Sequence, residues 1–180
     1  MINSLLKKGY RRFAARYDYD TEYMTYITDI STSAGLRLSV LPLFSQYKGP
    51  SEAKGVWAGA ALGSTLDGDC GPCLQLVLDM AVEARISPDD LALCLRGQAT
   101  DAGDVGLGFR FSQAAIADDP QLEELRTEIE QRFGPTAVIA ASFAASSGRV
   151  YPVMKRGLGF GGTCSQASIG GEVIRIAHWT

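Results

Sequence analysis

Apolar residues recur at helical spacing along almost the whole 180-residue chain, and this periodicity is the feature that most constrains its fold. Strand patterns are scarce, and a short strand or an extended arm is predicted only for residues 173–176, within a tail that otherwise resembles a glycine-rich loop. The sequence therefore predicts an all-α protein. Its expected helices cover residues 4–17, 20–31, 35–47, 51–66, 72–84, 87–95, 105–117, 120–133 and, as one long helix, 135–158.

The length of the chain suits a single domain over residues 1–180. A chain of this size can bury about two-thirds of the surface that its unfolded form exposes. Hydrophobic residues make up 46% of it and charged residues 21%, a balance typical of a packed protein. Within the domain we expect an N-terminal helical extension over residues 1–49, a helical core over 50–160 and a C-terminal tail over 161–180.

The charge balance argues against several partners. The formal net charge is -3, whereas nucleic-acid binding normally needs a concentrated excess of Lys and Arg. Lys7, Lys8, Arg11, Arg12 and Arg16 lie at helical spacing and are interpreted as the solvated face of the first helix. No apolar run reaches the roughly 18 residues of a membrane span, and the N-terminus lacks a secretory pattern. We therefore expect a cytoplasmic protein with neither a nucleic-acid nor a membrane partner.

Two cysteines, Cys70 and Cys73, open the predicted helix that follows the polar turn Asp67-Gly68-Asp69. A thiolate at a helix N-terminus meets unpaired backbone N–H groups and the positive end of the helix dipole, and both lower its pKa. The second sulfur is close enough to form a disulfide across one helical turn. We predict Cys70 and Cys73 as a catalytic pair, with Asp69 capping the first turn.

Other interpretations of the cysteine pair are weighed against this one. Thioredoxins carry the same tetrapeptide, but their fold needs a hydrophobic strand directly before it, where this chain has a helical pattern. A zinc site needs four close ligands, whereas Cys94 and Cys164 are isolated and His178 is the only histidine. We expect neither metal nor cofactor, and we expect Cys94 in the core. Two inert, buried cysteines remain the plain alternative.

The segment Asp69-Cys70-Gly71-Pro72-Cys73, the residues 74–81 that follow it and the order of helices over 50–160 resemble the alkylhydroperoxidase-D-like (AhpD-like) family, also catalogued with carboxymuconolactone decarboxylases. The resemblance implies a homo-oligomer of AhpD-like helical domains with a Cys-x-x-Cys motif at a helix N-terminus. It implies a thiol-dependent oxidoreductase that reduces peroxides or exchanges disulfides, served by a thiol reductant protein or a small dithiol. By the same resemblance Cys73 attacks peroxide to form a sulfenic acid, which Cys70 resolves to a disulfide.

The chain departs from the proton relay of that family. The family has a glutamate twelve residues before the first cysteine and a histidine four after the second, and these positions hold Ala58 and Val77. Such acid/base groups typically contribute about 10²- to 10⁴-fold to a rate. Asp67 and Asp69 are the nearest candidates for proton transfer, although an ionised carboxylate would raise the pKa of a neighbouring thiol.

Two further functions are considered. One is a non-enzymatic redox sensor or structural oligomer, in which the cysteine pair only switches subunit packing. The other is lactone decarboxylation, for which the sequence reveals no basic or hydrogen-bonding pocket. Gln75 is interpreted as a solvated residue, and Tyr151, Lys155 and Arg156 as core or surface residues that could also line a pocket.

Overall fold

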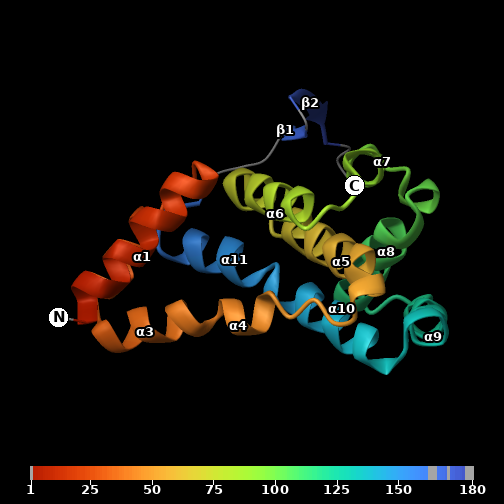
Figure 1. Ribbon diagram of the computed structural model, residues 1–180, viewed down its shortest axis with the longest axis horizontal. Helices are drawn as coiled ribbons and strands as arrows, with labels where there is room; N and C mark the ends of the chain where they lie inside the picture. Colours follow the sequence, from red (N-terminus) through yellow and green to blue (C-terminus); the bar gives the residue numbers. More distant parts are fainter. Residues whose placement is uncertain (1, 162–165, 170, 177–180) are drawn as a thin grey trace.

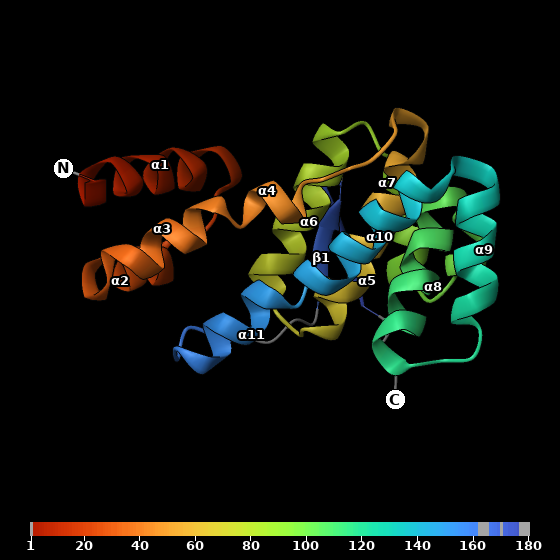
Figure 2. The same cartoon turned by 90° about the horizontal axis from the view of Figure 1, so that it is seen from below.

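The computed structural model of the chain describes residues 2–161, 166–169 and 171–176, and helices make up most of it (Figures 1 and 2). The mostly helical prediction is confirmed. The N-terminal helices are α1 (Ile2–Tyr17), α2 (Glu22–Ile30), α3 (Thr32–Val40) and the short α4 (Pro42–Ser45). The others are α5 (Lys54–Asp67), α6 (Gly71–Glu83), α7 (Pro88–Leu95), α8 (Gly103–Ala117), α9 (Leu122–Phe133), α10 (Pro135–Ser147) and α11 (Val150–Gly157), with 3₁₀ turns at Ser51–Ala53 and Ala99–Asp101.

Two of the predicted helices are each divided in the structure. The helix expected over residues 35–47 is split at Leu41, because Pro42 lacks the backbone N–H that would continue α3 and begins α4 instead. The helix expected over 135–158 ends at Ser147. Gly148 lies so close to α5 that an added methyl group would be 2.7 Å from the Cβ of Ser64. The chain turns at this contact, and α11 then runs toward the N-terminal helices (Figure 2).

The C-terminal tail contains a β-hairpin in place of the expected loop. β1 (Gln166–Ile169) pairs antiparallel with β2 (Glu172–Arg175). β2 agrees with the first of the two alternatives expected for residues 173–176, a strand or an extended arm, whereas β1 was not expected. Ala167, Ile169, Ile174 and Ile176 are buried in the main hydrophobic core. The tail therefore packs as part of the fold.

The hairpin is attached to α6 by a side chain that was expected to be only solvated. The Gln75 amide nitrogen donates to the carbonyl oxygen of Ser168 at 2.9 Å, and the backbone N–H of Ser168 donates to the Gln75 amide oxygen at 2.9 Å. Gln75 thus satisfies backbone groups of β1 as a neighbouring strand would. Arg96, which follows α7, forms an ion pair with Glu172 at the start of β2. The guanidinium nitrogen lies 2.7 Å from the carboxylate oxygen.

The buried residues form two clusters. The larger one lies among α5–α10 and the hairpin, and the smaller one lies between α1–α3 and α11. Tyr151 and Met154 of α11 pack on the N-terminal cluster. The N-terminal cluster is formed by Tyr10, Tyr19, Tyr23, Met24 and Leu38.

Reciprocal glycine contacts join α5 to α8 at the centre of the larger cluster. A methyl group at Gly59 of α5 would overlap the carbonyl oxygen of Val105 on α8. One at Gly108 of α8 would overlap the carbonyl oxygen of Val56 on α5. The two helix backbones therefore approach so closely that side chains larger than hydrogen are excluded at both positions.

We expect Gly59→Ala to lower the free energy of unfolding by about 1–3 kcal/mol, because the added methyl group forces α5 and α8 apart. Gly9→Ala is the matched control, since an added methyl group at Gly9 on α1 meets no atom within 4 Å. The control should raise stability by about 0.5–1 kcal/mol through helix propensity alone. Urea unfolding followed by far-UV circular dichroism measures both variants, and equal effects would contradict the close approach of α5 and α8.

Candidate functional site

Cys70 and Cys73 lie at the N-terminus of α6 with their sulfur atoms at disulfide distance. Cys70 is the N-cap residue and Cys73 the third residue of the helix, so their Cα atoms are 5.3 Å apart. Pro72 suits the first turn, where its missing N–H leaves no helical bond unmade. The N-cap is thus Cys70 rather than the predicted Asp69, which precedes it in a left-handed conformation with a φ of 48°.

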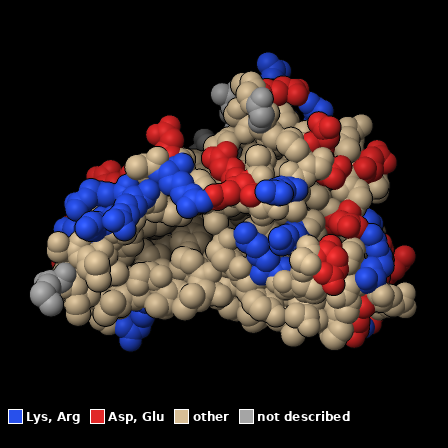
Figure 3. All heavy atoms as spheres, viewed as in Figure 1, with Lys and Arg blue, Asp and Glu red and all other residues tan. Residues whose placement is uncertain are grey.

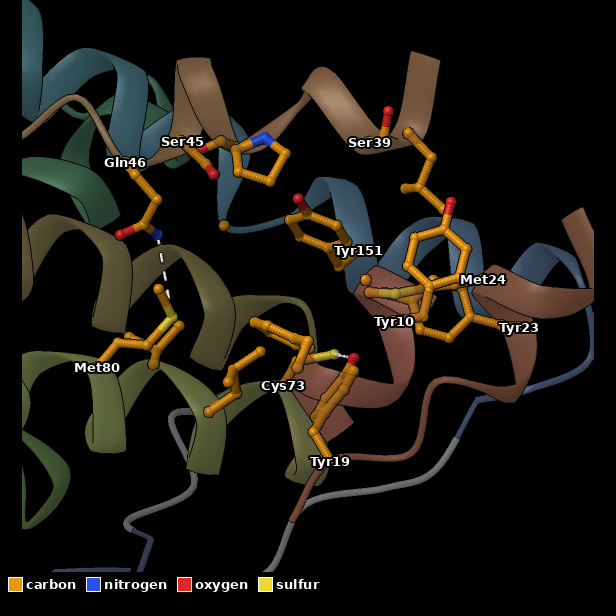
Figure 4. Close-up of a pocket in the computed structure, with 18 of the residues that line it drawn as sticks. Tyr10, Tyr19, Tyr23, Met24, Ser39, Ser45, Gln46, Cys73, Met80 and Tyr151 are labelled. Atoms are coloured by element: carbon orange, nitrogen blue, oxygen red, sulfur yellow. Dashed lines mark hydrogen bonds between the residues drawn. The ribbon is translucent and has the colours of Figure 1, made fainter. Parts of the chain in front are cut away.

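An apolar cavity of about 360 Å³ separates the N-terminal helices from α5 and α6, and Cys73 lies in its wall (Figure 4). Both cysteines are almost inaccessible to solvent, with exposed fractions of 3% for Cys70 and 4% for Cys73. In Figure 4, Gln46 and Met80 lie toward one end of the cavity, Tyr10, Tyr23 and Met24 toward the other, and Cys73 and Tyr19 between them. The cavity therefore passes alongside the Cys73 sulfur.

Tyr19 is the polar side chain that contacts Cys73. It comes from the turn between α1 and α2, and its hydroxyl oxygen lies 3.7 Å from the Cys73 sulfur. Burial raises the pKa of Tyr19, the neighbouring Tyr23 hydroxyl acts in the opposite direction, and the charge of Asp20 adds to the increase. Tyr19 is therefore a neutral phenol near pH 7, able to donate a hydrogen bond to a thiolate on Cys73.

Lys155 lies behind Tyr19 and is itself buried. Its ammonium nitrogen is 5.0 Å from the ring centroid of Tyr19 and 5.3 Å from that of Tyr23, both within cation–π range. Burial lowers the pKa of Lys155, while Asp20 acts in the opposite direction. Lys155 thus holds the Tyr19 ring beside Cys73. The other two residues that were considered as possible pocket residues differ in position. Tyr151 lines the cavity, and Arg156 is exposed.

The two positions of the family's proton relay hold apolar side chains in the structure as in the sequence. Ala58 is fully buried on α5, and Val77 lines the cavity. Asp67 forms an ion pair with Arg149 at 2.8 Å, and Asp69 is exposed just before Cys70. Neither carboxylate is among the described residues that line the cavity.

Sequence reasoning missed Tyr19, because 54 residues separate it from Cys73 and no motif connects them. The one local signal is the helix break near Asp18, which has a φ of 47° and directs the following residue back toward α6. A tyrosine after such a break is not by itself a functional pattern. The contact is therefore a product of the tertiary fold.

The remaining predicted residues lie elsewhere. Cys94 is fully buried on α7, and burial raises its pKa to about 12, so its predicted place in the core is confirmed. Cys164 and His178 lie outside the described residues. Within residues 2–161, 166–169 and 171–176, no group of three or more His, Cys, Asp or Glu side chains is close enough to hold a metal ion. None of the described helices combines the length and the apolar character needed to cross a membrane.

The fold and the site define a mostly helical protein in which a cysteine pair at a helix N-terminus borders an apolar cavity. No family model, curated protein or solved structure matches the chain.

The tyrosines that line the cavity predict alkaline sensitivity. Burial raises the pKa of Tyr151 to about 12 and raises that of Tyr23 as well. Their neutral forms are favoured in the folded state, so this stabilisation is complete below about pH 10 and is lost as pH rises toward the folded-state values. The free energy of unfolding should fall between pH 9 and pH 11.5 in both proteins. We expect the fall to be smaller in Tyr151→Phe than in the parent protein, by roughly 1–2 kcal/mol. Urea titrations at both pH values measure this difference, and parallel losses in the two proteins would contradict it.

Proposed function

We propose that the protein is a thiol-dependent oxidoreductase of the AhpD-like type, in which Cys70 and Cys73 alternate between dithiol and disulfide. One observation carries the proposal: the pair lies at disulfide distance at a helix N-terminus, with Cys73 in the wall of a cavity. The resemblance of residues 69–81 to the AhpD-like motif supports the same conclusion. Peroxide reduction is the activity that a buried pair beside a cavity serves best.

Cys73 is proposed as the nucleophile. Its sulfur borders the cavity, whereas Cys70 is not among the described lining residues. Cys73 is also within the first turn of α6, where unpaired backbone N–H groups and the helix dipole stabilise a thiolate. Both observations agree with the roles that the family resemblance implies.

The proposed reaction is balanced by the two cysteines and one peroxide. The Cys73 thiolate attacks the terminal oxygen of ROOH, the O–O bond breaks, and the products are a Cys73 sulfenic acid and an alkoxide that takes a proton. Cys70 then attacks the sulfenic sulfur and displaces hydroxide, which leaves as water after taking the Cys70 proton. The dithiol has lost two electrons and the peroxide has become an alcohol and water.

Tyr19 is proposed to supply the proton that the absent glutamate and histidine relay would have supplied. Its hydroxyl, 3.7 Å from the Cys73 sulfur, can donate to the thiolate and then to the departing alkoxide. Even with its pKa raised by burial, a phenol is a stronger acid than the alcohol that forms. The phenolate recovers from solvent the proton that Cys73 released on ionising.

A thiol reductant must return the disulfide to a dithiol by exchange through a mixed disulfide. The burial of both sulfurs favours a small dithiol over direct exchange with a large protein. A homo-oligomer is proposed as well, because Leu36, Val40 and Leu43 follow one another at helical intervals and are all exposed on α3 and α4.

We expect Cys73→Ser to abolish thiol-dependent peroxide turnover. Cys70→Ser should instead consume one equivalent of peroxide per chain and stop as a sulfenic acid that dimedone traps, because the resolving thiol is missing. Cys94→Ala is the control for an unrelated buried thiol and should retain turnover. Full turnover in both serine variants would overturn the proposal. A parent protein without turnover whose sedimentation changes on oxidation would favour a redox sensor instead.

We expect Tyr19→Phe to lower kcat/KM for peroxide by about 10²-fold and to raise the pKa of the Cys73 thiol, because a hydrogen-bond donor is lost. Stopped-flow turnover and the pH dependence of Cys73 alkylation by iodoacetamide measure the two effects. Tyr17→Phe is the matched control, since its hydroxyl donates to Glu83 at 2.6 Å on the surface. If both variants behave as the parent protein does, Tyr19 is not the proton donor.

A further inference from the structure

We propose that the cavity beside Cys73 binds a straight-chain anionic amphiphile of the fatty-acid type, with the chain inside the cavity and the acid group at α1. Such a ligand would be the substrate of the proposed oxidoreductase, and only its reaction at Cys73 rests on that proposed function. Binding itself depends on the cavity and on α1.

The shape and lining of the cavity suit an alkyl chain. Its volume of about 360 Å³ lies within the range of small-molecule sites, about 300–1,000 Å³. Leu6, Phe13, Leu76 and Val77 contribute apolar walls from α1 and α6. The end near Gln46 and the end near Tyr10 are far apart in Figure 4, which indicates an elongated rather than a round site.

The cavity reaches the surface beside α1. Leu5 lines it and is 71% exposed, and Gly9, one turn later, also lines it with open space where a side chain would be. Lys8 and Arg12 are helical neighbours of Leu5 and Gly9, three residues after each. Figure 3 shows Lys and Arg side chains in a row along α1 beside a hollow. The mouth of the cavity is therefore bordered by positive charge.

Lys8, Arg11 and Arg12 form no ion pair among the described residues, and Lys8 and Arg12 are the two of them that lie beside the mouth. Lys7 is paired with Asp29, and Arg16 is paired with Glu83. Lys8 and Arg12 are exposed and form no ion pair with any residue that the structure describes. A carboxylate at the mouth would gain two cationic partners, whereas a cationic head group would be repelled.

Inside the cavity, the hydroxyl of Tyr23 is poorly satisfied. Tyr23 lines the cavity, its side chain is fully buried, and its hydroxyl oxygen makes no hydrogen bond of normal geometry with the described residues, although the neighbouring Tyr19 hydroxyl interacts with it and raises the pKa of Tyr23. Such a group costs free energy unless a ligand or water satisfies it. Tyr23 would donate to an oxygen carried along the alkyl chain, on the Tyr19 side of the cavity. The substrate class is thus a fatty-acid hydroperoxide with the peroxide part-way along its chain.

The test is calorimetric titration of the oxidised 180-residue chain with dodecanoate, which needs no turnover. We expect saturable one-to-one binding, and weaker binding of dodecyltrimethylammonium. Gly9→Leu should weaken dodecanoate binding at least about tenfold, because the leucine occupies the space of the chain. Val77→Phe fills the same cavity from α6 and replaces Gly9→Leu if that variant does not fold.

Charge reversal provides a matched pair of variants on one helix. Arg12→Glu should weaken dodecanoate binding about threefold to tenfold, an effect that high salt reduces. Arg11→Glu is the control, because it changes the net charge equally. Arg11 follows Gly9 by two residues, which is about half a helical turn, so it lies on the opposite face of α1 from the mouth. Equal effects of the two reversals, or binding that neither cavity-filling variant weakens, would overturn the inference in favour of a general basic surface.

The outcome also separates this inference from the proposed function. Dodecanoate binding without thiol-dependent turnover would support the ligand site and overturn only the oxidoreductase. Turnover of hydrogen peroxide without dodecanoate binding would support the oxidoreductase and overturn only the ligand class.

Discussion

The close contact between α5 and α8 is the constraint on which the rest of the structure depends. Gly59 and Gly108 let the two backbones touch, and α10 packs beside them, where the Ser64 hydroxyl donates to the carbonyl oxygen of Ala145. α5 ends at Asp67 and α6 begins at Gly71, so the short turn between them fixes the start of the cysteine helix against this rigid core. The helix that carries the cysteine pair therefore begins directly after a helix of this core.

The described part of the cavity wall contains no acidic residue, so the proposed proton transfer relies on a phenol. An ionised carboxylate at this place would oppose a neighbouring thiolate by charge repulsion. A phenol stays neutral, donates a hydrogen bond and adds no negative charge. The Lys155 side-chain nitrogen lies within cation–π range of the Tyr19 and Tyr23 rings, and this contact helps to order both rings.

The N-terminal helices are part of the site rather than an addition to a complete core. They supply Tyr19 and one side of the cavity, and α11 returns to pack against them after the chain turns at Gly148. The hairpin closes another face of α6 through Gln75. The surroundings of Cys73 are thus assembled from the N-terminal helices, from α5 and α6 in the middle of the chain, and from α11 near its end.

The sequence by itself determined the mostly helical class, the placement of Cys70 and Cys73 at a helix start and the burial of Cys94, because these follow from local periodicity and from the proline in the first turn. Tertiary structure alone decided the break at Gly148, the strand that pairs with residues 172–175 and the contact between Tyr19 and Cys73. Each of these depends on atoms from segments far apart along the chain. Helical periodicity records which face of a segment is buried but not which distant segment covers it.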